Sequence, residues 1–143
     1  LLVGPYDSNP SALQPEELQP FIDEGIIEYF GEQADVRPYL KQCSTYVLPS
    51  YHEGTPKTVL EAMATGRSII TSDAPGCRET VTDGYNGFLV PIKDIDRLAE
   101  RMRSLIEDSS MSDLMAERSL KLAREKYDVN LVNKKIMETM KLL

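Results

Sequence analysis

The residues best suited to chemistry lie between Pro49 and Gly66, in the stretch PSYHEGTPKTVLEAMATG. This stretch holds two carboxylates, Glu53 and Glu61, and one cation, Lys57. A carboxylate accepts hydrogen bonds from two hydroxyl groups, so a diol is a suitable ligand. A cation in the first turn of a helix opposes the helix dipole at a cost of roughly 0.3–1 kcal/mol, so Lys57 indicates an anion with which it pairs.

The loop before the expected helix has the composition of an anion site. Gly54 lets backbone approach a ligand closely, and Pro56 suits the first helical position, where no amide is needed. The amides around Thr55, Lys57 and Thr58 are then free to bind an anion, with support from the helix dipole. Two plainer interpretations stay open: an ordinary strand-to-helix connection, and a surface ion pair between Lys57 and the glutamate four residues later.

A strand and a helix must hold this loop. The run Thr45–Leu48 predicts a strand, which Pro49 ends because proline cannot donate a ladder hydrogen bond. The stretch Thr58–Thr65 predicts a helix that ends at Gly66. Its expected buried face follows the helical spacing, with Val59, Leu60, Met63 and Ala64.

The rest of the chain alternates between strand and helix patterns. Further strands are expected at Leu1–Gly4, Ile26–Phe30, Ser68–Thr71 and Phe88–Val90. Further helices are expected at Pro15–Glu24, after a cap at Asp35, at Asp94–Asp108, from a cap at Ser110 to about Tyr127, and at Val129–Leu143. Their apolar positions are expected in the core, among them Phe21, Ile95, Ile106, Leu114 and Met140. The alternation predicts an α/β fold, a Rossmann-like three-layer sandwich with a mainly parallel sheet.

The loop Ser72–Glu79 is expected to form a second wall of the site, because doubly wound sheets bind ligands beyond the carboxyl ends of their strands. Arg78 in this loop either contacts phosphate or forms an ion pair with Glu79 or Asp83, and the ion pair is favoured. His52 is interpreted as an exposed loop residue, since it has no partner at metal-ligand spacing. Both cysteines, Cys43 and Cys77, are expected as thiols.

The central stretch resembles the E(x7)E segment of retaining glycosyltransferases of family four, which have the two-domain GT-B architecture. The matching residues are Glu53, Gly54, Pro56, Leu60, Glu61, Ala62, Met63, Ala64 and Gly66. The resemblance continues through LLVGP at the start of the chain, EYFGEQADVRPYLKQCSTYVLPS before the segment and SIITSDAPGCRETVTDGYNGFLVP after it. It therefore covers nearly the whole chain and implies the C-terminal, donor-binding half of such an enzyme.

The resemblance implies a role for each matching site residue. Glu61 would hold the ribose hydroxyls of a sugar nucleotide, and Glu53, the implied catalytic residue, would lie near the transferred sugar. The amides of Thr55–Thr58 would hold sugar hydroxyls and diphosphate, and Gly76 would allow a close backbone approach. The implied donor-binding set is Gly54, Thr55, Pro56, Lys57, Thr58, Glu61 and Gly76.

The implied reaction transfers a hexosyl group from a nucleoside diphosphate sugar to a hydroxyl with retention, without a metal or another cofactor. Within this family, the sequence most resembles bacterial enzymes of capsule, O-antigen or lipid-linked glycan synthesis. By that resemblance the donor is UDP-linked, and the acceptor is a glycan or a polyprenyl diphosphate sugar at the inner membrane face. The alternative is a non-catalytic module that binds nucleotide or another protein.

Composition limits the class of protein further. With 143 residues, of which 41% are hydrophobic, the chain is expected to form one domain, 1–143. A net charge of −7 without a basic block argues against nucleic acid as a partner. The longest apolar runs fall far short of the roughly 18–20 residues that span a bilayer, and no signal peptide opens the chain. A cytoplasmic location is expected.

The chain also departs from the family pattern. The N-terminal acceptor domain is absent, as is the first strand of the donor domain with the arginine and lysine that usually clamp the diphosphate, so this polypeptide alone is expected to be inactive. Contact with the acceptor, and peripheral contact with the membrane, would need that missing domain. The missing strand belongs between Leu1–Gly4 and Thr45–Leu48. We therefore expect the fragment to rearrange there or to associate with another chain, itself included.

Overall fold

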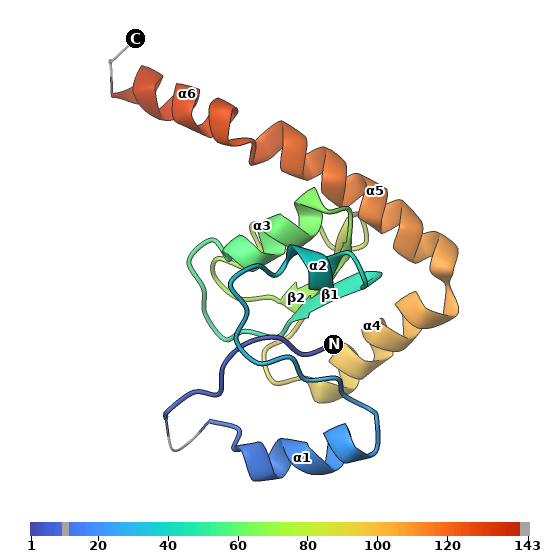
Figure 1. The fold of residues 1–143 in the computed structure, drawn as a ribbon. Helices are drawn as coiled ribbons and strands as arrows, with labels where there is room; N and C mark the ends of the chain where they lie inside the picture. Colours follow the sequence, from blue (N-terminus) through green and yellow to red (C-terminus); the bar gives the residue numbers. More distant parts are fainter. Residues whose placement is uncertain (10–11, 141–143) are drawn as a thin grey trace. The chain divides into compact units, whose positions relative to one another are not determined.

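A computed structural model describes residues 1–9 and 12–140, and it divides into two compact units, 1–43 and 44–143, which are described separately. Figure 1 labels the helices and strands. The helices are α1 (Pro15–Asp23), α2 (Arg37–Leu40), α3 (Lys57–Ala64), α4 (Ile95–Glu107), α5 (Ser109–Lys126) and α6 (Val129–Thr139). The strands are β1 (Thr45–Leu48), β2 (Ser68–Ser72) and β3 (Gly87–Val90).

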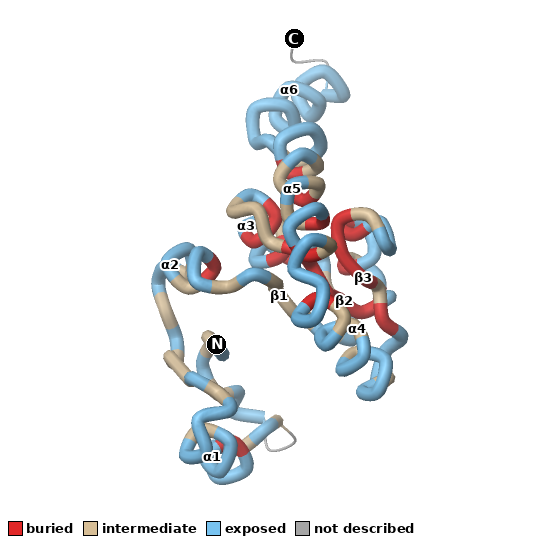
Figure 2. The backbone as a smooth tube through the Cα atoms, turned by 90° about the vertical axis from the view of Figure 1, so that its right-hand side faces the viewer, coloured by how far each residue is buried: buried red, intermediate tan, exposed pale blue. Residues whose placement is uncertain are grey.

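The second unit is built on a parallel sheet with the strand order β1-β2-β3. Val47, Ile70 and Phe88 stand in register across the three strands. On their side of the sheet they form a core with Leu105 of α4 and Met115 of α5. The central strand β2 is buried along its whole length, as Figure 2 shows. The sequence predicted a strand that is covered on both faces, and this burial is what such a strand shows.

Helix α3 covers the other face of the sheet. Side chains alternate along a strand, so Tyr46 points away from the Val47 side, and its hydroxyl reaches Thr58 of α3. The layers are therefore α3, the sheet, and α4 with the first half of α5, which confirms the predicted α/β sandwich. The buried residues of α3 are Val59, Ala62 and Met63, whereas the predicted Ala64 is exposed and Leu60 half-buried. Gly66 ends the helix as predicted, with φ +67°.

In the first unit, the two predicted strands do not form a ladder. Leu1–Gly4 and Ile26–Phe30 make a single parallel bridge, between Leu2 and Tyr29. An isolated pair of strands is marginal without further neighbours, so an apolar run alone does not make a strand. Helix α1 has the predicted limits to within one residue and buries Leu18, but Phe21 remains 48% exposed, which corrects the prediction that it lies in the core.

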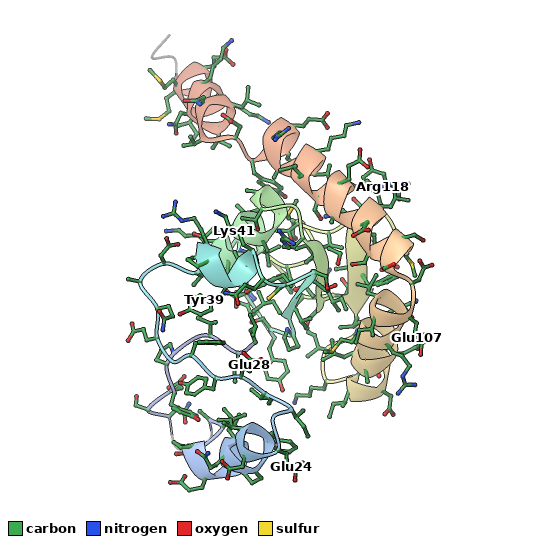
Figure 3. All side chains as sticks on the ribbon, turned by 45° about the vertical axis from the view of Figure 1, so that its right-hand side comes forward. Glu24, Glu28, Tyr39, Lys41, Glu107 and Arg118 are labelled. Atoms are coloured by element: carbon green, nitrogen blue, oxygen red, sulfur yellow. The ribbon has the colours of Figure 1, made fainter. Side chains whose placement is uncertain are left out.

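Helix α2 forms where the sequence predicted a short helix after Asp35. The Asp35 carboxylate accepts the backbone N–H of Arg37 at 3.0 Å, and its two oxygens accept from the guanidinium at 2.8 and 2.9 Å. These hydrogen bonds lower the pKa of Asp35 to about 2. Leu40 is buried, and the ring of Tyr39, labelled in Figure 3, lies 4.8 Å from that of Phe30. The N-cap of α2 is nevertheless Val36, without a side-chain cap, so Asp35 is not the cap that the sequence predicted and contacts Arg37 from one position before it.

Helices α4 and α5 have the predicted positions but not the predicted burial. In α4 only Leu105 is buried, while Ile95 and Ile106 are 77% and 78% exposed. The cap of α5 is Asp108 and not Ser110: its carboxylate accepts the Met111 N–H at 2.9 Å and the Ser110 hydroxyl at 2.7 Å. Those two hydrogen bonds lower the pKa of Asp108. In α5, Met115 is buried as expected, whereas the predicted core residue Leu114 is 46% exposed.

Helix α6 exposes the apolar face that the sequence placed in a core. Val129, Val132, Ile136 and Met140 are all exposed, and Leu143, the last member of that predicted stripe, lies outside the described residues. The prediction of core packing is therefore wrong for the described members. Helical spacing identifies an apolar face, but it does not identify what covers that face. No helix in the described ranges is both long and apolar enough to cross a bilayer.

Asn86 joins the turn before β3 to α5. It is fully buried, its amide oxygen accepts the Thr82 N–H at 2.8 Å, and its amide nitrogen donates to the Thr80 carbonyl at 3.3 Å. The Ser119 hydroxyl donates to the Asn86 carbonyl at 3.0 Å. This network connects the sheet to α5.

We expect Asn86→Ala to lower the free energy of unfolding by about 3 kcal/mol, because it leaves buried polar groups without partners. Urea unfolding monitored by circular dichroism measures this loss. The exposed Asn133 provides the matched control, and Asn133→Ala should change the free energy by less than about 0.5 kcal/mol. Equal stability of the two variants would contradict the prediction.

Candidate functional site

The loop 49–56 runs from the carboxyl end of β1 to the start of α3, where the sequence placed the site. It lies against the loop 72–79, which follows β2, because the Glu53 N–H donates to the Pro75 carbonyl at 3.2 Å. The structure therefore brings together the two loops that the sequence predicted as walls of one site. Ligands of doubly wound sheets bind at this edge.

Gly76 packs directly against the backbone of the first loop. A Cβ atom at this position would overlap the carbonyl oxygens of Gly54 and Glu53 and would lie 2.6 Å from the Glu53 carbonyl carbon. Its φ of +83° is in the left-handed region, which side chains other than glycine rarely adopt. The close approach that the sequence predicted for Gly76 is thus an approach to the neighbouring loop.

The start of α3 presents free backbone amides. Pro56 precedes the helix as its N-cap, with φ −70° and ψ 109°, which corrects the prediction that it is the first helical residue. Its carbonyl accepts the amides of Val59 and Leu60 at 3.1 and 3.3 Å. Within the described part of the chain, the amides of Lys57 and Thr58 have no acceptor, and no side chain caps the helix. An anion at this terminus would meet both amides and the positive end of the dipole.

Lys57 and Glu61 do not form the surface ion pair that was the plainer interpretation. Both side chains are exposed, and among the described residues neither takes part in a salt bridge. The ammonium group of Lys57 and the carboxylate of Glu61 are therefore both available to a ligand beside the first turn of α3.

Glu53 is held more tightly than the other candidate residues. It is half-buried, and the Ser50 hydroxyl donates to its Oε1 at 2.6 Å. Together with its N–H bond to Pro75, this contact fixes both the backbone and the carboxylate. Sequence reasoning used Ser50 only as part of the family resemblance and missed this contact.

Tyr46 is a further site residue that sequence reasoning missed. Its hydroxyl donates to Thr58 Oγ1 at 2.8 Å. Burial above all raises the pKa of Tyr46; the hydrogen bond with Thr58 lowers it, and the charges of Glu53 and Glu61 raise it further. Its position inside a strand pattern made it look like a packing residue.

Arg78 pairs with a residue that was not considered. Its Nε lies 2.9 Å from Asp73 Oδ1, and its Nη2 donates to the Asp73 carbonyl at 2.9 Å. The prediction of Glu79 or Asp83 as the partner is wrong, although an ion pair was the favoured interpretation. The amides of Cys77 and Arg78 both bond the Ala74 carbonyl, so the loop coils back and brings Arg78 over Asp73.

The remaining reactive residues lie as the sequence indicated. Cys43 and Cys77 are thiols: the Cys43 Sγ donates to the Tyr39 carbonyl at 3.3 Å, and Cys77 is fully buried. His52 is exposed. A separate cavity of about 220 Å³ lies at the carboxyl ends of the strands and is lined in part by Tyr51, Ser72 and Lys93. Ser72 begins the loop predicted as the second wall, whereas the predicted catalytic and donor-binding residues do not line this cavity.

Residues 1–108 match the family described as glycosyl transferases group 1. The N,N'-diacetylbacillosaminyl-diphospho-undecaprenol alpha-1,3-N-acetylgalactosaminyltransferase of Campylobacter jejuni is 35% identical over 138 residues, which cover 96% of this chain and 35% of that protein. An Escherichia coli UDP-Gal:alpha-D-GlcNAc-diphosphoundecaprenol alpha-1,3-galactosyltransferase is 33% identical over 57% of this chain and 21% of its own length. The chain thus spans about a third or less of these relatives.

Solved structures share the fold. Anabaena Alr3699/HepE in complex with UDP superposes with a TM-score of 0.82 at 26% identity, over 90% of this chain and 35% of that chain. The C-terminal domain of LpcC, a glycosyl transferase group 1 family protein of Francisella tularensis, gives a TM-score of 0.70 at 28% identity, over 80% of this chain and 62% of that one. The predicted resemblance to bacterial GT-B glycosyltransferases is confirmed.

Proposed function

Because the chain belongs to the glycosyl transferases group 1 family, we propose that it is the donor-binding part, 1–143, of a glycosyltransferase that uses a UDP-linked sugar. The observation that carries this proposal is the start of α3, where, among the described residues, the amides of Lys57 and Thr58 have no acceptor and the carboxylate of Glu61 has no salt-bridge partner. The UDP complex of a structure with the same fold supports the choice of nucleotide.

Each site residue has a chemical task in the proposed reaction. Glu61 accepts hydrogen bonds from the ribose hydroxyls, and the amides of Thr55, Lys57 and Thr58 hold the diphosphate. As the glycosidic bond breaks, the leaving diphosphate gains negative charge, which the amides, the helix dipole and Lys57 stabilise. Glu53 lies near the transferred hexose. In this proposal transfer proceeds with retention, and no metal or other cofactor is used.

The acceptor is proposed from the relatives. The two named transferases act on sugars linked through diphosphate to undecaprenol, so we propose a polyprenyl-linked or similar glycan acceptor for cell-surface polysaccharide synthesis. Such an acceptor requires more of the protein than this chain, which spans 35% of the Campylobacter relative. The proposed location is the cytoplasm, at the inner face of the membrane that holds the acceptor.

Calorimetric titration of the full-length protein with UDP, GDP and ADP tests the donor proposal. UDP should bind most tightly, and Glu61→Ala should weaken it about 100-fold, because two charge-assisted hydrogen bonds to ribose are lost. Stability should be unchanged, since the carboxylate is exposed and has no salt-bridge partner among the described residues.

The exposed Glu117 on α5 is the matched control, and Glu117→Ala should bind UDP like the wild type. UDP affinity that does not depend on Glu61 would favour a non-catalytic binding module. So would the absence of sugar transfer from any donor by the full-length protein.

A further inference from the structure

The hydrogen bond between Tyr46 and Thr58 sets the direction of a second hydroxyl at the site. Tyr46 lies in β1, and its phenolic O–H donates to Thr58 Oγ1 at 2.8 Å. Thr58 is the second residue of α3, in the turn whose amides are free. With one lone pair of Oγ1 occupied by the phenol, the Thr58 hydroxyl keeps its own proton for another acceptor.

Thr65, at the other end of α3, shows where a threonine hydroxyl in a helix usually donates its proton. The Thr65 hydroxyl donates to the backbone carbonyls of Glu61 and Ala62, both at 3.0 Å. A threonine within a helix commonly satisfies its proton in this way. Thr58 stands too early in α3 for a helical carbonyl one turn before it, and among the described residues its hydroxyl donates to none. Its proton is therefore left for a ligand.

The Tyr46 phenol keeps the proton that it donates to Thr58, because its surroundings oppose ionisation. Burial raises its pKa first, the hydrogen bond with Thr58 lowers it, and the charges of Glu53 and Glu61 raise it, with a raised pKa as the net result. A phenolate would accept the Thr58 proton and reverse the direction of the hydrogen bond.

We propose that Tyr46 is a positioning residue of the donor site: it holds Thr58 Oγ1 as an acceptor so that the Thr58 hydroxyl donates to the diphosphate. This inference rests on the proposed function, and it adds a hydroxyl donor to the amides at the same terminus. Hydrogen bonds in a chain polarise one another, so the Thr58 proton becomes a better donor than an isolated hydroxyl.

Tyr46→Phe in the full-length protein tests the proposal, because it removes one oxygen and keeps the ring. UDP should bind about fivefold more weakly by calorimetry, the effect of one hydrogen bond. Thr58→Val should have a similar effect, and the double variant should be no weaker than the weaker single variant. Binding of uridine, which lacks phosphate, should be unchanged in all three variants.

The controls separate positioning from folding. Tyr85→Phe alters a tyrosine whose ring stacks with Arg118, before β3, and should leave UDP affinity unchanged. If Tyr46→Phe weakens uridine as much as UDP, its role is structural and the proposal fails. If Tyr46→Phe binds UDP normally while Glu61→Ala does not, the positioning role fails and the proposed function stands. A wild-type protein that does not bind UDP overturns both.

Discussion

Gly76→Ala should destabilise the protein by about 2–5 kcal/mol and abolish UDP binding. Two costs add here: a left-handed backbone that costs an alanine about 1–2 kcal/mol, and an overlap between Cβ and the backbone that costs about 1–3 kcal/mol more. The atoms that a Cβ would meet are the carbonyl oxygens of Gly54 and Glu53, so they cannot move aside as a flexible side chain would. Relief of the overlap must displace the loop that carries Glu53.

A comparison with Gly84→Ala separates the backbone cost from the cost of the overlap. The Gly84 φ of +72° is close to the +83° of Gly76, but a Cβ there would meet no atom within 4 Å. Gly84→Ala should therefore cost only the backbone term, about 1–2 kcal/mol, and should bind UDP normally. Urea unfolding gives the stabilities and calorimetry the affinities. Equal losses in the two variants would show that the contact between the loops does not hold the site.

The elements around the site could be predicted because their signals are local. The limits of β1 follow from an apolar run that Pro49 ends, and the end of α3 follows from Gly66. The free amides at the start of α3 also follow from a loop whose cap position holds no hydrogen-bonding side chain, although Pro56 is one position earlier than predicted. A strand, a loop and a helix in sequence thus place Glu53 and Glu61 at one edge without knowledge of distant contacts.

Burial of helix faces, strand pairing and the contact of Tyr46 could not be predicted, because each depends on residues distant in the sequence. Ile95 and Met140 have helical spacing, yet both are exposed, since spacing says which face is apolar and not what covers it. The run Ile26–Phe30 has the composition of a strand but forms only one bridge, because ladders need neighbours. Tyr46 resembles a core residue until the fold brings Thr58, twelve residues later, within 2.8 Å of its hydroxyl.

Glu53→Gln should lower kcat for sugar transfer about 100-fold to 1,000-fold and leave UDP affinity unchanged. Glutamine keeps the shape of the side chain and can accept the Ser50 hydroxyl, which donates to Glu53 Oε1 at 2.6 Å. The variant therefore removes charge and not structure, and a lost carboxylate beside a reacting sugar has an effect of about this size. UDP lacks the hexose that Glu53 is proposed to meet, so its binding should not respond.

Ser50→Ala completes the comparison. It removes the hydrogen bond that orients the carboxylate but keeps the charge, so kcat should fall by about tenfold, the effect of one charge-assisted hydrogen bond. Steady-state kinetics of the full-length protein with the donor sugar, together with UDP calorimetry, measures both variants. A parallel loss of UDP affinity and kcat in Glu53→Gln would mean that Glu53 supports the loop and does not act on the sugar. We expect UDP affinity to be unchanged in Glu53→Gln. The backbone N–H of residue 53 donates to the Pro75 carbonyl at 3.2 Å and holds the loop whichever side chain the residue carries.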